Sequence, residues 1–214
     1  MPKIDAAFLI ETFRRAGDRL EAERSGLCVL DGEIGDGDHG TSMANGFAAI
    51  NSRLRLLGNT GATPATLLKE AAGAFLGEVG ATVGPLYATA LMQGARLLET
   101  ETLERRDIGR LVVAFADGIR SRGRAELGDK TMIDVWYPAG HSAIAAASEG
   151  QPLDAIARTM RQTAEQASEA TITMIAARGR ASRLRERSLG HLDPGGASAA
   201  IIIGAIADAM TSAP

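Results

Sequence analysis

Apolar residues recur along this chain with the spacing of amphipathic helices, and no segment shows sustained alternation with strand-forming residues. One face of the first segment carries Leu9, Phe13, Ala16 and Leu20. A stronger stripe covers 108–119, and a third begins at 153 and predicts a helix to about residue 176. Further helices are expected over 41–56, 63–76, 84–99, 139–148 and 196–211. We therefore predict a single all-α domain, residues 1–214, of about eight helices.

The composition is that of a folded globular protein. Hydrophobic residues make up 45% of the 214 residues and charged residues 23%. The net charge of −3 argues against general nucleic-acid binding, which needs a broad basic surface. The single cysteine, Cys28, allows no internal disulfide. The first residues lack a signal-peptide pattern, and the longest apolar run, 197–207, is too short to span a bilayer. We expect a cytoplasmic protein with neither a nucleic-acid nor a membrane partner.

The segment 31–40 is rich in acids and glycines. It contains the four carboxylates Asp31, Glu33, Asp36 and Asp38 and the four glycines 32, 35, 37 and 40. Clustered carboxylates repel one another unless a cation lies among them. Glycine allows a positive φ, so we expect an acidic glycine loop whose side chains converge on a metal ion. The alternative interpretation is a solvated acidic turn, because Asp and Gly favour turns.

The ligand types favour magnesium. An EF-hand needs a glutamate at position twelve, but that position is Ser42 counted from Asp31 and Phe47 counted from Asp36. Zinc prefers Cys and His ligands, and this chain has one cysteine and three histidines. A carboxylate site with few ligands suits Mg²⁺, which shares its remaining positions with water and substrate phosphates. A nucleotide ligand is therefore our hypothesis, and a Ca²⁺-binding protein without a nucleotide is a rival one.

Two glycine-rich segments, 80–85 and 191–196, each precede an expected helix. A helix N-terminus with free N–H groups favours a phosphate. The first segment is equally well interpreted as a tight turn. In the second, Asp193 as an N-cap and Pro194 as the first residue predict mainly a helix start. The segment 123–131 is not a Walker A motif, because Asp129 separates Gly128 from Lys130 and the preceding segment is helical in pattern.

Positive charge is concentrated between 178 and 187, which contains five arginines and one glutamate. The planar guanidinium group of arginine suits phosphate oxygens. A solvated basic loop, or a patch for an acidic partner, is an equally simple interpretation. We expect one or two of these arginines at a bound phosphate and the others at the surface.

Residues 30–40 resemble the metal loop of the nucleotide-binding L subunit of dihydroxyacetone kinases. The resemblance continues in order over 80–86, 121–126, 128–136, 171–174, 178–182 and 186–195. It implies a barrel of eight antiparallel helices with the nucleotide bound among the interhelical loops at one end. It also implies a phosphotransferase that uses Mg²⁺ and ADP or ATP.

The resemblance assigns roles to residues in this chain. Asp31, Asp36 and Asp38 match the acids that hold two Mg²⁺ ions between the nucleotide phosphates, whereas Glu33 matches no ligand. Arg180 matches an arginine near the phosphates. The remaining matches, which contact the nucleotide or close its site, are His39, Gly40, Thr41, Ser42, Thr82, Val83, Gly123, Met132, Asp193, Gly195 and Gly196. Relatives often have a serine at the position of Val83 and a small hydroxylated residue at that of Ala197, so only backbone contacts are expected at those two positions.

The resemblance also implies partners. A separate K subunit would bind the ketose, because a chain of this length has no room for that domain. In one branch ADP stays bound as a coenzyme and is rephosphorylated by a phosphoprotein of the phosphoenolpyruvate-dependent phosphotransferase system, and this is the branch we favour. In another branch ATP is an exchangeable substrate. A regulatory or interaction role on the same scaffold and a homodimer both remain open.

Overall fold

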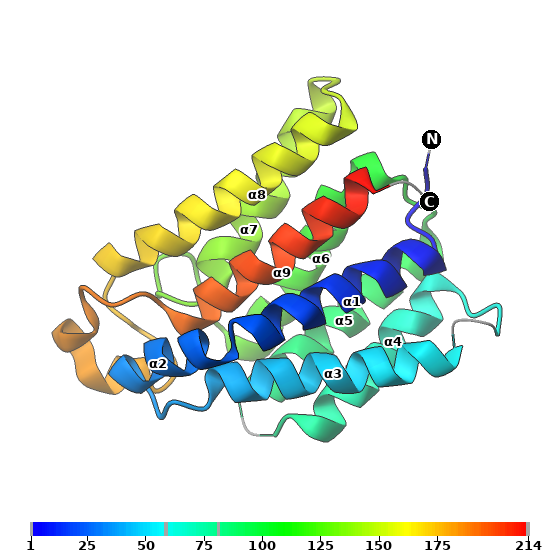
Figure 1. The fold of residues 1–214 in the computed structure, drawn as a ribbon. Coiled ribbons are helices and arrows are strands. Elements are labelled where there is room, and N and C mark those ends of the chain that lie inside the picture. Colours follow the sequence, from blue (N-terminus) through cyan, green and yellow to red (C-terminus); the bar gives the residue numbers. More distant parts are fainter. Residues whose placement is uncertain (1, 58–59, 81, 213–214) are drawn as a thin grey trace.

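The computed structural model describes residues 2–57, 60–80 and 82–212, which form long α-helices joined by short loops (Figure 1). The α-helices are α1 (Ala6–Ala22), α2 (Arg24–Ile34), α3 (His39–Leu57), α4 (Pro64–Glu78), α5 (Val83–Thr100), α6 (Ile108–Gly123), α7 (Ile133–Ser148), α8 (Leu153–Ala170) and α9 (Pro194–Thr211). Three 3-10 helices complete the described part: η1 (Arg105–Asp107), η2 (Thr171–Thr173) and η3 (Ala181–Ser188). The only β pairing within the described residues is an isolated bridge between Lys3 and Glu104.

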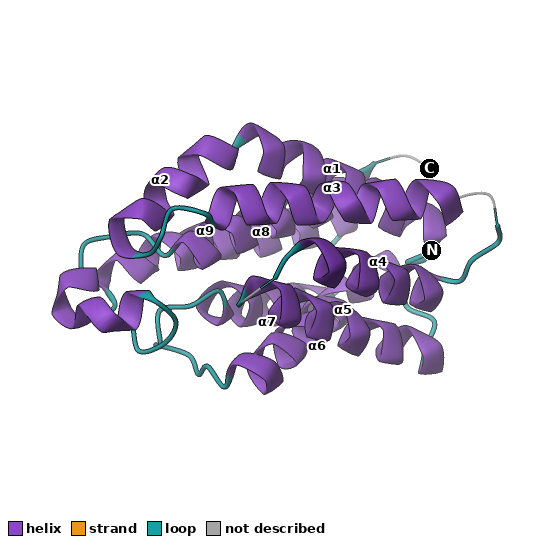
Figure 2. Ribbon diagram, turned by 90° about the horizontal axis from the view of Figure 1, so that it is seen from below, coloured by secondary structure: helices purple, strands orange, loops and turns teal. Residues whose placement is uncertain are grey.

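Eight of these helices close into a ring. From α3 to α9 each helix packs against the next, α9 packs against α1, and α1 packs against α3. Helix α2 continues α1 beyond the ring and lies on the end of α3 (Figures 1 and 2). The all-α prediction and the implied barrel of eight antiparallel helices are confirmed.

The centre of the barrel is filled by apolar side chains from every side. The stripe expected over 108–119 points inward, with Ile108, Leu111, Val112 and Ile119 each at most 2% exposed. Successive aromatic rings cross the core with centroids 5.4–6.4 Å apart, in the order Phe13, Phe47, Phe75, Tyr87, Trp136 and Phe115. They surround a small cavity of about 40 Å³ with an apolar lining. Each helix has one apolar face, and burial of these faces in the centre stabilises the closed ring.

Three expected boundaries were wrong. Helix α7 begins at Ile133 rather than near 139, because Asp134 accepts the N–H of Thr131 and so anchors an earlier start. The interior Pro138 hid this start in the sequence. Helix α8 ends at Ala170, and Thr171 is buried in the first of the 3-10 turns that follow. The acidic segment is also partly helical, as described with the site below.

Helix α9 has the length and apolarity of a membrane-spanning helix, but 72% of that stretch is buried within the protein. It is one of the helices of the barrel and packs between α8 and α1. Its start agrees with the prediction, since the Asp193 carboxylate accepts the N–H of Gly196 and Pro194 is the first helical residue.

The two ends of the barrel differ in construction. The chain termini lie at one end (Figure 1), where the backbone of 2–4 pairs with 103–105. We call this the closed end. The other end carries α2, the start of α5, the loop 124–132 and a long connection between α8 and α9 (Figure 1). We call residues 171–191 of that connection the strap.

Candidate functional site

A pocket of about 490 Å³ opens among the loops opposite the closed end. Its size is typical of small-molecule sites. Ten of the residues singled out in the sequence line it: Asp31, Asp38, His39, Thr82, Val83, Gly123, Met132, Arg180, Asp193 and Gly195. The fold therefore brings residues from six separate segments of the sequence into one site.

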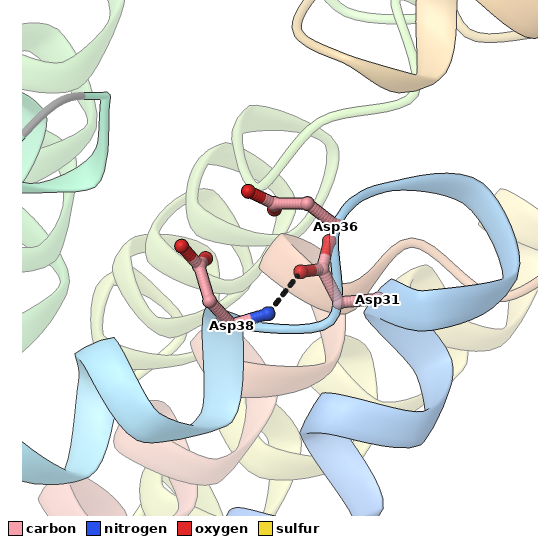
Figure 3. Close-up of side chains that lie close together, drawn as sticks. All are labelled: Asp31, Asp36 and Asp38. Atoms are coloured by element: carbon pink, nitrogen blue, oxygen red, sulfur yellow. Dashed lines mark hydrogen bonds between the residues drawn. The ribbon is translucent and has the colours of Figure 1, made fainter.

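Three aspartates lie close together at the acidic edge of this pocket (Figure 3): Asp31 and Asp38 line it, and Asp36 lies beside them. Carboxylate oxygens of Asp31, Asp36 and Asp38 all lie within 4.8 Å of one another. Asp31 is 9% exposed, and its Oδ2 accepts the backbone N–H groups of Asp38 at 2.9 Å and His39 at 3.2 Å. These two bonds fix the turn on which the other acids stand. An all-oxygen set of this kind fits a hard divalent cation.

The acidic segment is only partly the loop that we expected. Helix α2 runs to Ile34, so Asp31, Gly32 and Glu33 lie in its last turn. Of the glycines in 31–40 only Gly37 has a positive φ, at 78°. The expectation of positive φ at glycines 32, 35 and 40 was wrong, because two lie in helices and Gly35 has a φ of −141°. Leu27, Asp31 and Ile34 are buried on one face of α2. This burial stabilises α2 as far as Ile34, although the helix contains glycines, which have low helix propensity.

Arg180 reaches the acids from the strap. Its guanidinium group donates to Asp36 Oδ1 and lies 3.6 Å from Asp38 Oδ1. Three carboxylates and one guanidinium leave the cluster with an excess of negative charge. A divalent cation would lower this repulsion, and Arg180 would then stand beside any phosphate that shares the cation.

His39 forms the floor between the acids and α9. It is 6% exposed, and its Nε2 lies 2.9 Å from Ser198 Oγ. Ser198 Oγ donates to the carbonyl of Gly195 at 3.0 Å, so His39 Nε2 carries the proton in the bond between them. Burial lowers the pKa of His39, while the nearby carboxylate of Asp31 opposes that change. Burial thus favours the neutral imidazole of His39 beside the pocket.

One part of the pocket wall is apolar. It consists of Leu86, Ile119, Ala125 and Met132, with Gly123 at the end of α6. Thr82 and Val83 at the start of α5 also line the pocket. A ligand with a flat apolar ring and an anionic tail would match this division of the pocket.

Four of the expected nucleotide residues are not on the pocket wall: Gly40, Thr41, Ser42 and Gly196. Gly40 lies where α3 crosses α2, and a Cβ there would be 2.0 Å from the carbonyl oxygen of Arg24. The Thr41 hydroxyl lies 3.5 Å from Cys28 Sγ, and the Gly196 N–H is bound by Asp193. Their contact with a ligand stays a prediction.

Asp193 accepts the N–H of Gly196 and has a raised pKa. It is 8% exposed at the N-terminus of α9, where it also lines the pocket. Burial raises its pKa to about 7, although the N–H of Gly196 and the ammonium of Lys130 favour the charged form.

Sequence reasoning missed Lys130, which lines the pocket and is 2% exposed. It was considered only as part of a Walker A motif, and that motif is indeed absent. A lysine directly after Gly128 and Asp129 carries no periodic signal, so only the fold shows it to be buried. Among the strap arginines, Arg178 lines the pocket and pairs with Asp129 at 3.1 Å, and Arg183, Arg185 and Arg187 are exposed.

Comparison with known proteins shows the family. The family model described as the DAK2 domain matches residues 33–208. The PEP-dependent dihydroxyacetone kinase 2, ADP-binding subunit DhaL, of Listeria innocua is 34% identical over 211 residues, which is 98% of this chain and 97% of the relative. The PEP-dependent dihydroxyacetone kinase, ADP-binding subunit DhaL, of Escherichia coli is 36% identical over 191 residues, with 89% and 90% covered.

A solved structure has the same fold. It is the dihydroxyacetone kinase from C. freundii in complex with AMP-PNP and Mg²⁺, with a TM-score of 0.69 and 24% sequence identity. The match covers 95% of this chain but 33% of that one. The barrel is therefore one part of a longer protein in that case.

Proposed function

The chain belongs to the DAK2 domain family, and from this we propose that it is the ADP-binding subunit of a dihydroxyacetone kinase. The reaction would transfer a phosphoryl group from a magnesium-bound nucleotide to dihydroxyacetone or a related short ketose. The observation that carries the proposal is the division of one pocket between a three-carboxylate edge with Arg180 and an apolar wall. Similarity to kinase subunits over 98% and 89% of this chain supports it.

The acidic edge would hold the metal and the phosphates. Asp31, Asp36 and Asp38 would bind Mg²⁺, two ions in our proposal, and the bound ions would neutralise charge on the transferred phosphoryl group. Asp31 is held in place by two backbone N–H groups, so it needs little reorganisation to serve as a ligand. Arg180 would donate to phosphate oxygens as charge develops there. Phosphoryl transfer asks for this positioning and needs no protein nucleophile.

The remaining residues would bind and orient the nucleotide. The start of α5, with Thr82 and Val83, offers backbone N–H groups to phosphate oxygens. Met132 and Gly123 would enclose the adenine ring, and Met is an adaptable apolar wall. His39, Asp193 and Gly195 would close the floor of the site. The matches Gly40, Thr41, Ser42 and Gly196 would act at its edge or through the packing of α3 and α9.

The proposal includes partners that supply what this barrel lacks. A K subunit would present the ketose to the open face of the pocket. A phosphoprotein of the phosphoenolpyruvate-dependent system would rephosphorylate ADP, in keeping with relatives that are PEP-dependent and ADP-binding. The protein would act in the cytoplasm, without a nucleic-acid or membrane partner, and as a single domain over 1–214. The alternatives are exchangeable ATP and a nucleotide-responsive regulatory role. A homodimer would be compatible with each.

Native mass spectrometry of the freshly purified protein, with and without chelator, tests the site. We expect added mass equal to ADP and two Mg²⁺, lost together on chelation. A bare chain that binds ATP only with added Mg²⁺ would favour the exchangeable-substrate alternative. A chain that binds neither nucleotide would overturn the proposal, and binding of Ca²⁺ alone would support the rival metal-binding function.

Arg180→Ala separates transfer from binding. Because Arg180 is to act on developing charge, its loss should lower the rate of phosphoryl transfer more than the affinity for ADP. Arg183→Ala, at an exposed position of the same strap, is the matched control. Equal losses of rate and affinity would assign Arg180 to ground-state binding.

A further inference from the structure

The buried ammonium group of Lys130 lies under the strap and is surrounded by carbonyl oxygens. Lys130 Nζ lies 2.9 Å from the carbonyl oxygen of Thr171, 3.2 Å from that of Met174, and 2.7 Å from those of Ser188 and His191. An ammonium group has three N–H donors, so four acceptors leave none of them free. All four partners are acceptors, which requires the protonated form.

The four carbonyls come from both arms of the strap. Thr171 and Met174 lie on the arm that leaves α8, and Ser188 and His191 lie on the arm that returns to α9. Arg180 is between the arms. Other bonds hold the arms as well: the N–H of Gly190 donates to Ile172 O at 2.9 Å, and the N–H of Ala177 donates to Asp129 O at 3.0 Å. Lys130 is the one group in the described residues for which bonds to four strap residues are seen.

The local backbone is shaped to point Lys130 inward. Its φ is 56°, in the left-handed region that a lysine rarely adopts. Asp134 holds this turn by accepting the N–H of Gly128 at 2.5 Å and that of Thr131 at 2.8 Å. Neighbouring hydrogen bonds hold Lys130 in this uncommon conformation beside the candidate site. Such strain at a functional site is evidence that the residue has a functional role.

We propose that Lys130 is a positioning residue that acts as a tethered monovalent cation, closing the strap so that Arg180 is held over Asp36 and Asp38. Rings of backbone carbonyls replace the hydration shell of K⁺ in other proteins, and the Lys130 ammonium occupies such a ring here. A variant without the side chain should therefore accept NH₄⁺ or K⁺ in its place. Closure of the strap does not depend on the proposed function, but the consequence for phosphoryl transfer rests on it.

Limited trypsin digestion of Lys130→Ala reports closure directly, because the strap carries five arginines. We expect cleavage between 178 and 187 to be at least roughly tenfold faster than in the parent, since proteolysis follows the population of the open form. Ammonium or potassium chloride should restore protection, and lithium chloride at equal ionic strength should not. Cleavage at the parent rate, or equal protection by all three salts, would overturn the proposal.

Two further variants make the test specific. Lys130→Met keeps the side chain's bulk without its charge, so it should open the strap but not respond to ammonium. Lys69→Ala removes an exposed lysine that pairs with Glu99, and should leave strap cleavage unchanged. If Lys130→Ala does not fold, its refolding decides: helicity recovered with ammonium and not with lithium supports the proposal, and any other result contradicts it.

The transfer reaction provides a separate readout. In Lys130→Ala we expect the rate of phosphoryl transfer to fall at least roughly tenfold, since Arg180 would lose its fixed position. Its ADP affinity should change less, and ammonium should restore the rate. Salt-specific strap closure without any transfer in the parent would leave Lys130 correct and the proposed function wrong. Transfer that is lost without an opened strap would refute the role of Lys130.

Discussion

The two ends of the barrel each contain a buried cation that binds backbone carbonyls, yet the two cations serve different structures. At the closed end Arg105, 7% exposed, donates through Nη1 to the carbonyl oxygens of Ala209 and Met210 at 3.4 Å and of Ser212 at 3.0 Å. These are among the carbonyls that every α-helix leaves unpaired at its C-terminus. Arg105 thus completes α9, and its guanidinium also lies 5.1 Å from the ring centre of Phe8.

Lys130 at the opposite end binds carbonyls of the strap, where the only regular structure consists of 3-10 turns. A cation that caps a helix adds stability to a structure that packing already defines. A cation that joins two arms of a loop decides the shape of that loop. The comparison teaches that the closed end is built for stability, whereas the pocket end uses similar bonds to hold charged side chains close to one another.

The sharpest test of this contrast is Asp36→Ala at the pocket end. Asp36 is 43% exposed, and its removal takes away one of the three proposed metal ligands while relieving repulsion. We expect Mg²⁺-dependent ADP binding to weaken by roughly 100-fold or more, about 3 kcal/mol, with helicity unchanged. Titration calorimetry with ADP and Mg²⁺ measures the loss. Asp18→Ala on α1 is the control, and unaltered affinity in Asp36→Ala would refute the metal assignment.

At the closed end Arg105→Ala should lower the stability of the fold and leave ligand binding unchanged. It leaves three helix carbonyls without their buried donor, so the free energy of unfolding should fall by about 2–4 kcal/mol. ADP affinity should not change. Urea denaturation followed by circular dichroism gives the first quantity. The control Arg110→Ala breaks only an exposed pair with Glu101 and should cost less than about 1 kcal/mol. A large loss of ADP affinity in Arg105→Ala would show that the ends are coupled.

Gly40→Ala should affect stability and binding together, because it acts where α2 rests on α3. The added Cβ would meet the carbonyl oxygen of Arg24 at 2.0 Å, so the free energy of unfolding should fall by about 1–3 kcal/mol and ADP binding should weaken. Gly73→Ala on α4 is matched to it, since a Cβ there meets nothing within 4 Å. That change should raise stability by about 0.5–1 kcal/mol. Thermal melts of both variants would test this, and an equal response would contradict the packing role of Gly40.

The last prediction is a pH slope from Asp193. Its pKa is raised to about 7 by burial, so between pH 4 and 7 the folded protein holds a proton that the unfolded chain has lost. The free energy of unfolding therefore falls as pH rises through this window, by at most about 1.4 kcal/mol per pH unit. It becomes independent of this group above about pH 7. The stability advantage of Asp193→Asn over the parent should grow across the window and then level off. Urea denaturation in chelator at several pH values measures it, and a constant difference would exclude the titration.

Much of the fold could be predicted from the pattern of apolar residues. The inward stripe of α6 agrees with its buried residues, and the caps of α9 were read correctly from Asp193 and Pro194. The errors occurred where long-range contacts outweigh local preference. Burial of Leu27 and Ile34 extends α2 through two glycines, and Asp134 starts α7 before Pro138.

The candidate site divides in the same way. Asp31, Asp36, Asp38 and Arg180 were named from residue type and resemblance, and they do lie together. The bonds of Asp31 to two backbone N–H groups could not be predicted, because they depend on where α2 ends and α3 begins. Nor could the position of Gly40 within a helix contact, since the sequence predicts that this residue lies in the acidic glycine loop.

By itself, then, the sequence determined the helices, the chemistry of the acidic edge and the family, because each of these is encoded in residue type and short spacing. The tertiary structure alone decided that Lys130, in the loop between α6 and α7, would be buried beneath the strap and bind its two arms. The four carbonyls around Lys130 lie 41 to 61 residues away along the chain. Every residue has a carbonyl, so no pattern of side chains marks the four that the closed barrel brings to one ammonium group.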